Sequence, residues 1–222
     1  SQASTPQDVT TRPAPSFERR AHELTRATEN DFKGGRNGET LAPHNVQRAA
    51  LLGGELVPYL QRFLDGAPVD DGPNGASAPV APEVVARLLA VIDDPRADDV
   101  LGRARQSPDP VVRVAAVGSL DAKRHRRWIV EALDSKTPQI RAAAFTALAR
   151  TPADDDEAGR LLIEGAREGV RSACEWITAH RRAAAFEVLS DPNTVGIARK
   201  TIFSALAKSS TGPSAEELRT LA

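Results

Sequence analysis

The densest group of charged side chains is a short basic run near the middle of the chain. It consists of Lys123, Arg124, His125, Arg126 and Arg127. Because the N-terminus of a helix favours anions, basic residues at the start of a predicted helix need carboxylates, phosphates or an acidic partner. A second basic pair occupies the analogous turn further along, Arg181 and Arg182. These seven residues are the candidate binding residues.

An acidic stretch, residues 153–157, lies between the two basic ones. A surface that follows a phosphate backbone needs like-signed contacts in succession, so this alternation disfavours nucleic acid, as does the net charge of −1. The alternation favours salt bridges between neighbouring turns, or a protein partner of complementary charge. Nucleic-acid binding through residues 123–127 and 181–182 remains the alternative function.

Residues for catalysis or metal binding do not converge in the sequence. It contains no Gly-rich phosphate loop and no metal-ligand spacing, so we assign no catalytic residue, metal or cofactor. Cys174, the single cysteine, falls in the apolar stripe of a predicted helix, where an inert buried thiol is expected. His125 and His180 lie in turns among arginines and are expected to be solvated. We therefore expect a protein that is not an enzyme.

The composition indicates a soluble helical protein. Of 222 residues, 41% are hydrophobic and 27% charged, enough to bury a core, while aromatic residues make up only 4%. Small apolar side chains allow close helix packing, and alanine has the highest helix propensity. No apolar run approaches the roughly 18 to 20 residues of a membrane span. With no signal-peptide pattern and one cysteine, we predict a cytoplasmic protein that does not bind membranes.

Four helical segments share a register that is marked by a recurring arginine. Arg113, Arg141, Arg171 and Arg199 follow one another at spacings of 28, 30 and 28 residues. Apolar or small residues recur at offsets of −1, +3 and +7 from each arginine, which is one face of an α-helix. Each of these helices is preceded by a shorter one. Pairs of short helices cannot bury their apolar faces alone, so fixed-period recurrence predicts a stack.

The segments "DPVVRVAAVGSL", "TPQIRAAAFTAL" and "VRSACEWI" resemble the second helices of HEAT-like repeats, specifically the short repeats of the phycobilisome-lyase type. The resemblance covers residues 97–208. It implies an all-α fold, a right-handed α-solenoid of stacked antiparallel helix pairs with a partly irregular N-terminal region. It also implies that Asp109 and Arg113 tie one repeat to the next, with the other recurring arginines forming a structural ladder.

Enzymes built on HEAT-like repeats provide further alternatives. Deoxyhypusine hydroxylase binds iron through repeated His-Glu pairs, of which this chain has one, His22 and Glu23, outside the repeats. Phycobilin lyases and alkylpurine glycosylases of this class use a cleft lined by aromatic residues. Trp128 and Trp176 could line such a cleft, but both are expected to fill core or turn space. The favoured function is a non-enzymatic scaffold or adaptor that binds a protein partner.

The chain divides into three predicted regions. Residues 1–16, rich in Ser, Thr, Gln and Pro, are expected to be a flexible tail. Residues 17–80 are expected to form an N-terminal helical region that ends in a loop, 66–80. The solenoid is expected to occupy residues 81–222, and its last helix opens with a capping box formed by Ser214 and Glu217.

Overall fold

The computed structural model describes residues 17–34, 42–67, 69–70, 76–77 and 80–208. The tail predicted for residues 1–16 and the capping box at Ser214 lie outside the described residues. The predicted helical class is confirmed, and the helices run in chain order as follows: α1 Phe17–Gly34, α2 Pro43–Leu52, the 3-10 helix η1 Gly53–Leu56, α3 Val57–Leu64, α4 Pro82–Val91, α5 Pro95–Ala104, α6 Pro110–Ser119, α7 Arg126–Leu133, α8 Pro138–Leu148, α9 Asp156–Arg167, α10 Arg171–His180, α11 Arg182–Ser190 and α12 Gly196–Lys208.

The predicted loop 66–80 contains a small β-hairpin. Two short strands, β1 Val69–Asp70 and β2 Ala76–Ser77, pair antiparallel, and within the described residues they are the only strands. Two residues per strand is too short to contribute a core, so the hairpin is a local feature of the connection between α3 and α4.

The helix starts follow from local sequence. Proline opens α4, α5, α6 and α8, where the missing N–H has no helical partner to lose and the fixed φ suits the first turn. Asp94, Asp109 and Asp155 accept a backbone N–H from the first turns of α5, α6 and α9. An N-cap of this kind typically contributes about 1 kcal/mol to stability.

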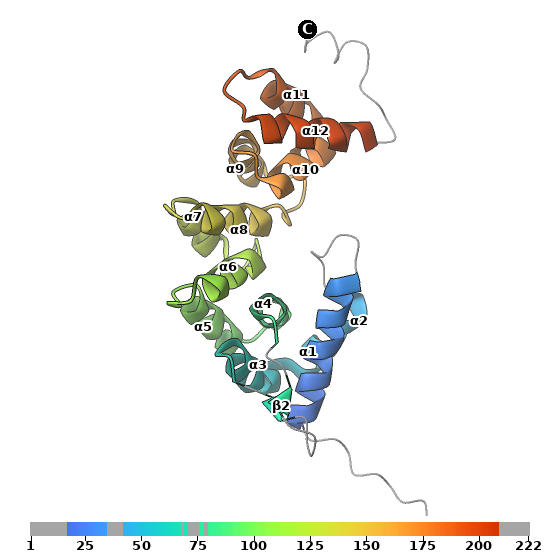
Figure 1. Ribbon diagram of the computed structural model, residues 1–222, viewed down its shortest axis with the longest axis vertical. Coiled ribbons are helices and arrows are strands. Elements are labelled where there is room, and N and C mark those ends of the chain that lie inside the picture. The colour runs from blue at the N-terminus through green and yellow to red at the C-terminus, as the bar shows by residue number, and fades with distance from the viewer. Residues whose placement is uncertain (1–16, 35–41, 68, 71–75, 78–79, 209–222) are drawn as a thin grey trace, which may run out of the picture.

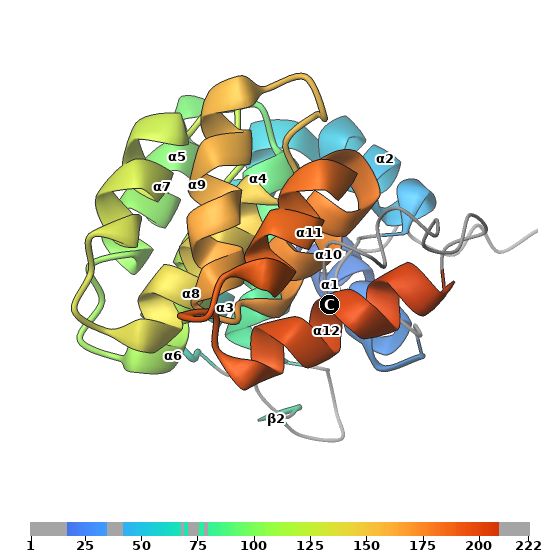
Figure 2. The same ribbon diagram turned by 90° about the horizontal axis from the view of Figure 1, so that it is seen from above.

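From α4 onward the helices form two rows. We call α4, α6, α8, α10 and α12 the inner row, since consecutive members contact one another directly. The outer row consists of α5, α7, α9 and α11, each packed against its inner-row neighbours. In Figure 1 the outer helices α5, α7 and α9 lie on one side of the stack and α1 lies beside α4 on the other. Figure 2, turned by 90°, shows the same separation of α5, α7 and α9 from α1 and α2.

The apolar stripe predicted from the recurring arginine is confirmed in part. One place before the arginines, Val112 and Ala198 are buried, whereas Ile140 and Val170 are half-buried. Residues three places after the arginines are 0% exposed in all four helices, namely Ala116, Ala144, Cys174 and Ile202. Seven places after the arginines, Leu120, Leu148 and Leu206 are also buried. Thr178 takes this place in α10, where it is half-buried and its hydroxyl donates to the carbonyl of Cys174.

The buried residues form two hydrophobic clusters. One extends from α1 to Ala116 of α6, and the other begins at Val117 of the same helix and continues to α12. The helices of the N-terminal region therefore share their core with α4, α5 and α6. Trp128 packs against both clusters and links them across α6 and α7. None of the described helices combines the length and the apolar character that a bilayer crossing requires.

Two glycines provide a matched test of packing in this core. A Cβ at Gly165 in α9 would lie 2.6 Å from Cδ1 of the buried Phe145 ring, whereas a Cβ at Gly118 in α6 would meet the Ala143 Cβ at an ordinary 3.6 Å. We expect Gly165→Ala to lower the free energy of unfolding by about 1 to 3 kcal/mol, since the ring must move. Gly118→Ala is expected to raise it by about 0.5 to 1 kcal/mol through helix propensity. Urea unfolding of both variants measures the difference, and equal stabilities would contradict this packing.

Candidate functional site

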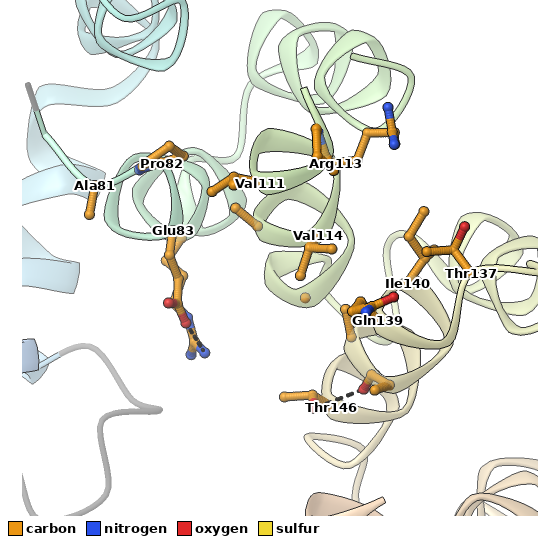
Figure 3. A pocket seen from close by; sticks show the side chains of 16 residues that line it. Ala81, Pro82, Glu83, Val111, Arg113, Val114, Thr137, Gln139, Ile140 and Thr146 are labelled. Atoms are coloured by element: carbon orange, nitrogen blue, oxygen red, sulfur yellow. Dashed lines mark hydrogen bonds and ion pairs between the residues drawn. The ribbon is translucent and has the colours of Figure 1, made fainter. Parts of the chain in front are cut away.

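A depression lies over the inner row and spans α4, α6 and α8. It has a volume of about 820 Å³ and is mostly apolar. Val111 and Val114 of α6 and Ile140 of α8 supply its larger apolar side chains, and Val111 is 61% exposed. Figure 3 shows Gln139 and Thr146 of α8 on the opposite side from Glu83 of α4. We call this depression the inner groove.

Small side chains line much of the inner groove. Ala115 and Gly118 of α6 and Ala142 and Ala143 of α8 lie between the bulkier residues. Their small size lets α6 and α8 approach each other closely, and it also leaves the surface above them hollow. A second chain could therefore come near the backbone of both helices.

Three charged residues line the inner groove. Glu83 and Arg87 of α4 form an i, i+4 pair with Oε1 and Nη2 3.4 Å apart. Arg113 of α6 is half-buried and lies on the side of α6 that faces Thr137 and Ile140 (Figure 3). The charged groups of the groove are thus the oppositely charged pair Glu83–Arg87 and one further cation, Arg113.

The recurring arginines mostly bind backbone carbonyls just past the outer helix of their own pair. In α6, α8 and α12 the guanidinium donates to such a carbonyl, which has no partner in the helix before it. The donor–acceptor distances are 2.5 and 2.9 Å from Arg113 to the carbonyls of Ser107 and Pro108, 3.0 Å from Arg141 to Ser135, and 2.8 Å from Arg199 to Asp191. These contacts orient each outer helix on its inner one.

Two members of the expected ladder behave differently. Asp109 accepts from the N–H of Val111 as the N-cap of α6, so its short side chain is engaged within the first turn of its own helix. Arg171 donates to Glu175 of its own helix at 2.8 Å. Arg141 does link neighbouring pairs, since its Nε and Nη2 lie 3.4 Å from Oε2 of Glu168.

Arg124, in the basic run, stabilises the fold by binding carbonyls at the end of another helix. Its Nη1 and Nη2 donate to the carbonyls of Ile92 and Ala90, both at 3.1 Å, at the C-terminal end of α4. Nη2 is also 3.0 Å from a carboxylate oxygen of Asp98. Arg150 repeats this arrangement one pair later, with Nη2 2.8 Å from the carbonyls of Gly118 and Leu120.

His125 is buried, which corrects the expectation of a solvated side chain. Its ring stacks on Trp128 with centroids 5.1 Å apart and an interplanar angle of 12°. Nδ1 accepts from the N–H of Asp121 at 3.0 Å, and Nε2 lies 2.9 Å from Oδ1 of Asp98. Both ring nitrogens are satisfied inside the protein, so burial costs little. His180 is exposed, as predicted.

The acidic stretch 153–157 neutralises two of the candidate binding residues. Arg126 forms an ion pair with Asp155, and Nη2 of Arg181 lies 2.5 Å from Oδ1 of Asp156. Salt bridges between neighbouring turns, one of the two predicted arrangements, are thus confirmed for these arginines. The guanidinium of Arg182 lies over the Phe186 ring at 5.7 Å. Lys123 and Arg127 are exposed.

The two tryptophans fill space between helices. Trp176 is buried and its Nε1 donates to the carbonyl of Thr151 at 3.1 Å. Trp128 is sandwiched between His125 and Arg105, whose guanidinium carbon lies 5.2 Å from the ring centre. Neither indole lines the inner groove, so the aromatic cleft of the enzyme-like alternative is not formed by these residues.

Cys174 is a buried thiol, as predicted. Burial raises its pKa to about 11, and the nearby carboxylate of Glu175 adds to the shift. Its Sγ lies 3.6 Å from the carbonyl of Ala166. Among the described residues, no three His, Cys, Asp or Glu side chains gather where they could hold a metal ion.

The sequence identified the inner row and placed Arg113 in its structural ladder, but it did not indicate the groove or its exposed Val111. Val111 lies two places before a recurring arginine and is therefore outside the buried stripe. An apolar residue in that place was the available signal, since Gln139 and Gly169 occupy it in α8 and before α10. Ile197, in the same place in α12, is likewise exposed.

Arg124 and Lys123 are neighbours with different environments, which gives a stability test. We expect Arg124→Ala to lower the free energy of unfolding by about 1 to 3 kcal/mol, because it leaves the carbonyls of Ala90 and Ile92 without their donor and removes the cation beside the Asp98 carboxylate. Lys123→Ala, on the surface, is expected to change it by less than about 0.5 kcal/mol. Chemical denaturation measures both. A large loss for Lys123→Ala, or none for Arg124→Ala, would contradict the assigned roles.

The state of Cys174 can be tested by alkylation. Because the thiolate is the reactive form, a buried thiol with a pKa raised to about 11 should resist iodoacetamide at neutral pH in the native protein. Unfolding in denaturant should expose the thiol and allow complete modification, which mass spectrometry would show. Rapid modification of the native protein would contradict its burial.

Comparison with known proteins adds no relative to this description. No protein-family model matches the chain, no curated protein matches it, and no solved structure matches it. The candidate site therefore rests on the geometry of the inner row and on the charges around it.

Proposed function

We propose that the protein is a non-enzymatic adaptor that binds a protein partner in its inner groove. One observation carries this proposal. The surface over α4, α6 and α8 is hollow and mainly apolar, and Val111, one of the residues that line it, exposes 61% of its surface. Exposed apolar surface in a concave setting is typical of binding sites, since it gains free energy when a partner removes it from water.

The proposal includes the finer architecture that the repeat resemblance implies. Successive helix pairs in a right-handed, HEAT-like solenoid present their inner helices side by side, which creates an extended groove. Three features support it: the shared register of the four arginines, the buried residues three places after each of them, and the direct contacts along the inner row. In such an arrangement, the groove is formed by the inner helices that lie side by side.

The charge arrangement favours this function over nucleic-acid binding. Arg124, Arg126 and Arg181 bind carbonyls or carboxylates of the protein itself, and His125 is buried. A nucleic-acid site would need these groups for phosphates, because affinity for a polyanion depends on the number of cations that contact it.

Site-specific cross-linking tests the proposal. A photoreactive benzoylphenylalanine replaces Val111 or Gln139 in the inner groove, and the matched controls carry it at Val130 of α7 or Glu157 of α9, exposed on the outer row. We expect one protein to be cross-linked from both inner positions and from neither outer position in a lysate of the source organism. The purified partner should then bind the unmodified chain in isothermal titration calorimetry.

Two outcomes would contradict the adaptor function. Cross-links that form equally from inner and outer positions would show that the inner row is not the binding surface. An identified protein that fails to bind when purified would show that the cross-link came from chance contact.

A further inference from the structure

Arg113 is the group in the inner groove whose charge is not neutralised by the protein. Among the residues that the structure describes, no carboxylate oxygen lies within ion-pair distance of it, whereas its counterpart Arg141 in the next inner helix lies 3.4 Å from Glu168. The nearby carboxylate of Asp109 is used as the N-cap of α6. Arg113 also lies in the first turns of α6, where the helix dipole adds positive potential.

The guanidinium of Arg113 is held in place with donors to spare. Nη1 donates to the carbonyls of Ser107 and Pro108, which fixes the plane of the group. A guanidinium has five N–H donors, and those on Nε and Nη2 of Arg113 have no acceptor in the described part of the chain. A cation that is already oriented loses little conformational entropy when it binds a carboxylate.

Val111, the exposed apolar residue of the groove, lies on the opposite side of α6 from Arg113. Figure 3 shows Val111 directed toward the α4 side of α6 and Arg113 directed toward the α8 side. Val114, one turn further on, adds apolar surface between them. A segment that crosses the first turns of α6 would therefore meet an apolar anchor and a cation in succession.

We infer that the occupant of the inner groove is an acidic segment of a partner protein, which places apolar side chains on Val111 and Val114 and a carboxylate on Arg113. This inference rests on the proposed adaptor function and specifies the partner's chemistry. The charges of the groove favour this occupant, because Glu83 and Arg87 of α4 pair with each other and the charge of Arg113 on α6 remains for the partner. An oriented guanidinium with adjacent free donors suits a carboxylate because both can form paired hydrogen bonds.

Selection from a random peptide library displayed on phage, with the purified full chain as target, tests the inference. We expect enriched peptides to combine apolar residues with Asp or Glu. Their affinities are measured with synthetic fluorescent peptides by fluorescence anisotropy. Val111→Glu and Arg113→Glu should each weaken binding by about tenfold or more, which corresponds to about 1.4 kcal/mol. When the Arg113→Glu variant is the target of the selection, the enriched peptides should contain Lys and Arg in place of Asp and Glu.

Matched variants separate binding from folding. Val130→Glu on the outer row should leave the affinity unchanged, and Arg113→Lys, which keeps the charge, should retain more of the affinity than Arg113→Glu. Thermal unfolding followed by circular dichroism identifies any variant that fails to fold. Val111 is exposed at the second position of α6, where an acidic residue suits the helix dipole, so Val111→Glu is expected to fold.

The possible failures are distinguishable. Enrichment of peptides without carboxylates, no enrichment at all, or binding that ignores both Val111 and Arg113 would each overturn the inference. If the enriched peptides ignore these two residues but lose affinity in Gln139→Glu, the inner row still binds protein and only the acidic chemistry is wrong.

Discussion

The structure depends on the fact that a helix of about ten residues cannot bury its apolar face by itself. Each inner helix therefore seals its face against the next inner helix and against the outer helices on either side. Ala116, Ala144, Cys174 and Ile202 occupy the same place in successive helices and are all fully buried. Small residues at most of these places bring the helices close together, and close packing at every step keeps the stack continuous across both hydrophobic clusters.

Arginine side chains provide the hydrogen bonds that accompany this apolar packing. A stack of short helices has many helix ends, and each end leaves carbonyls that need donors. Arg124 and Arg150 reach back to the carbonyls at the ends of α4 and α6, one pair before their own. Arg113 and Arg141 do the same for the ends of outer helices. A long side chain with five donors can satisfy two carbonyls at once, which is how Arg113, Arg124 and Arg150 stabilise the fold.

Periodic features of the sequence predicted the helical class and most of the buried positions of the inner helices, because the pattern recurs in four helices. Helix starts were predictable too, since Pro110 and Pro138 mark first turns directly. Whether a charged or polar side chain is buried or exposed was not predictable, because this depends on contacts with residues that are distant in the sequence. His125 is buried only because Asp98, 27 residues earlier, and Trp128 enclose its ring. Lys123, two residues earlier in the same basic run, is exposed.

The same limit explains why the candidate site follows from structure and not from sequence. Arg113 and Arg141 occupy equivalent places and bind equivalent carbonyls, so no local pattern separates them. They differ because the turn after α9 brings Glu168 to Arg141, while no carboxylate in the described residues reaches Arg113. A neutralised arginine completes the architecture, whereas one that keeps its charge beside an exposed valine has donors left for another molecule. Where similar helices pack in a row, a binding site is therefore expected at the helix that differs from its counterparts, and here that helix is α6.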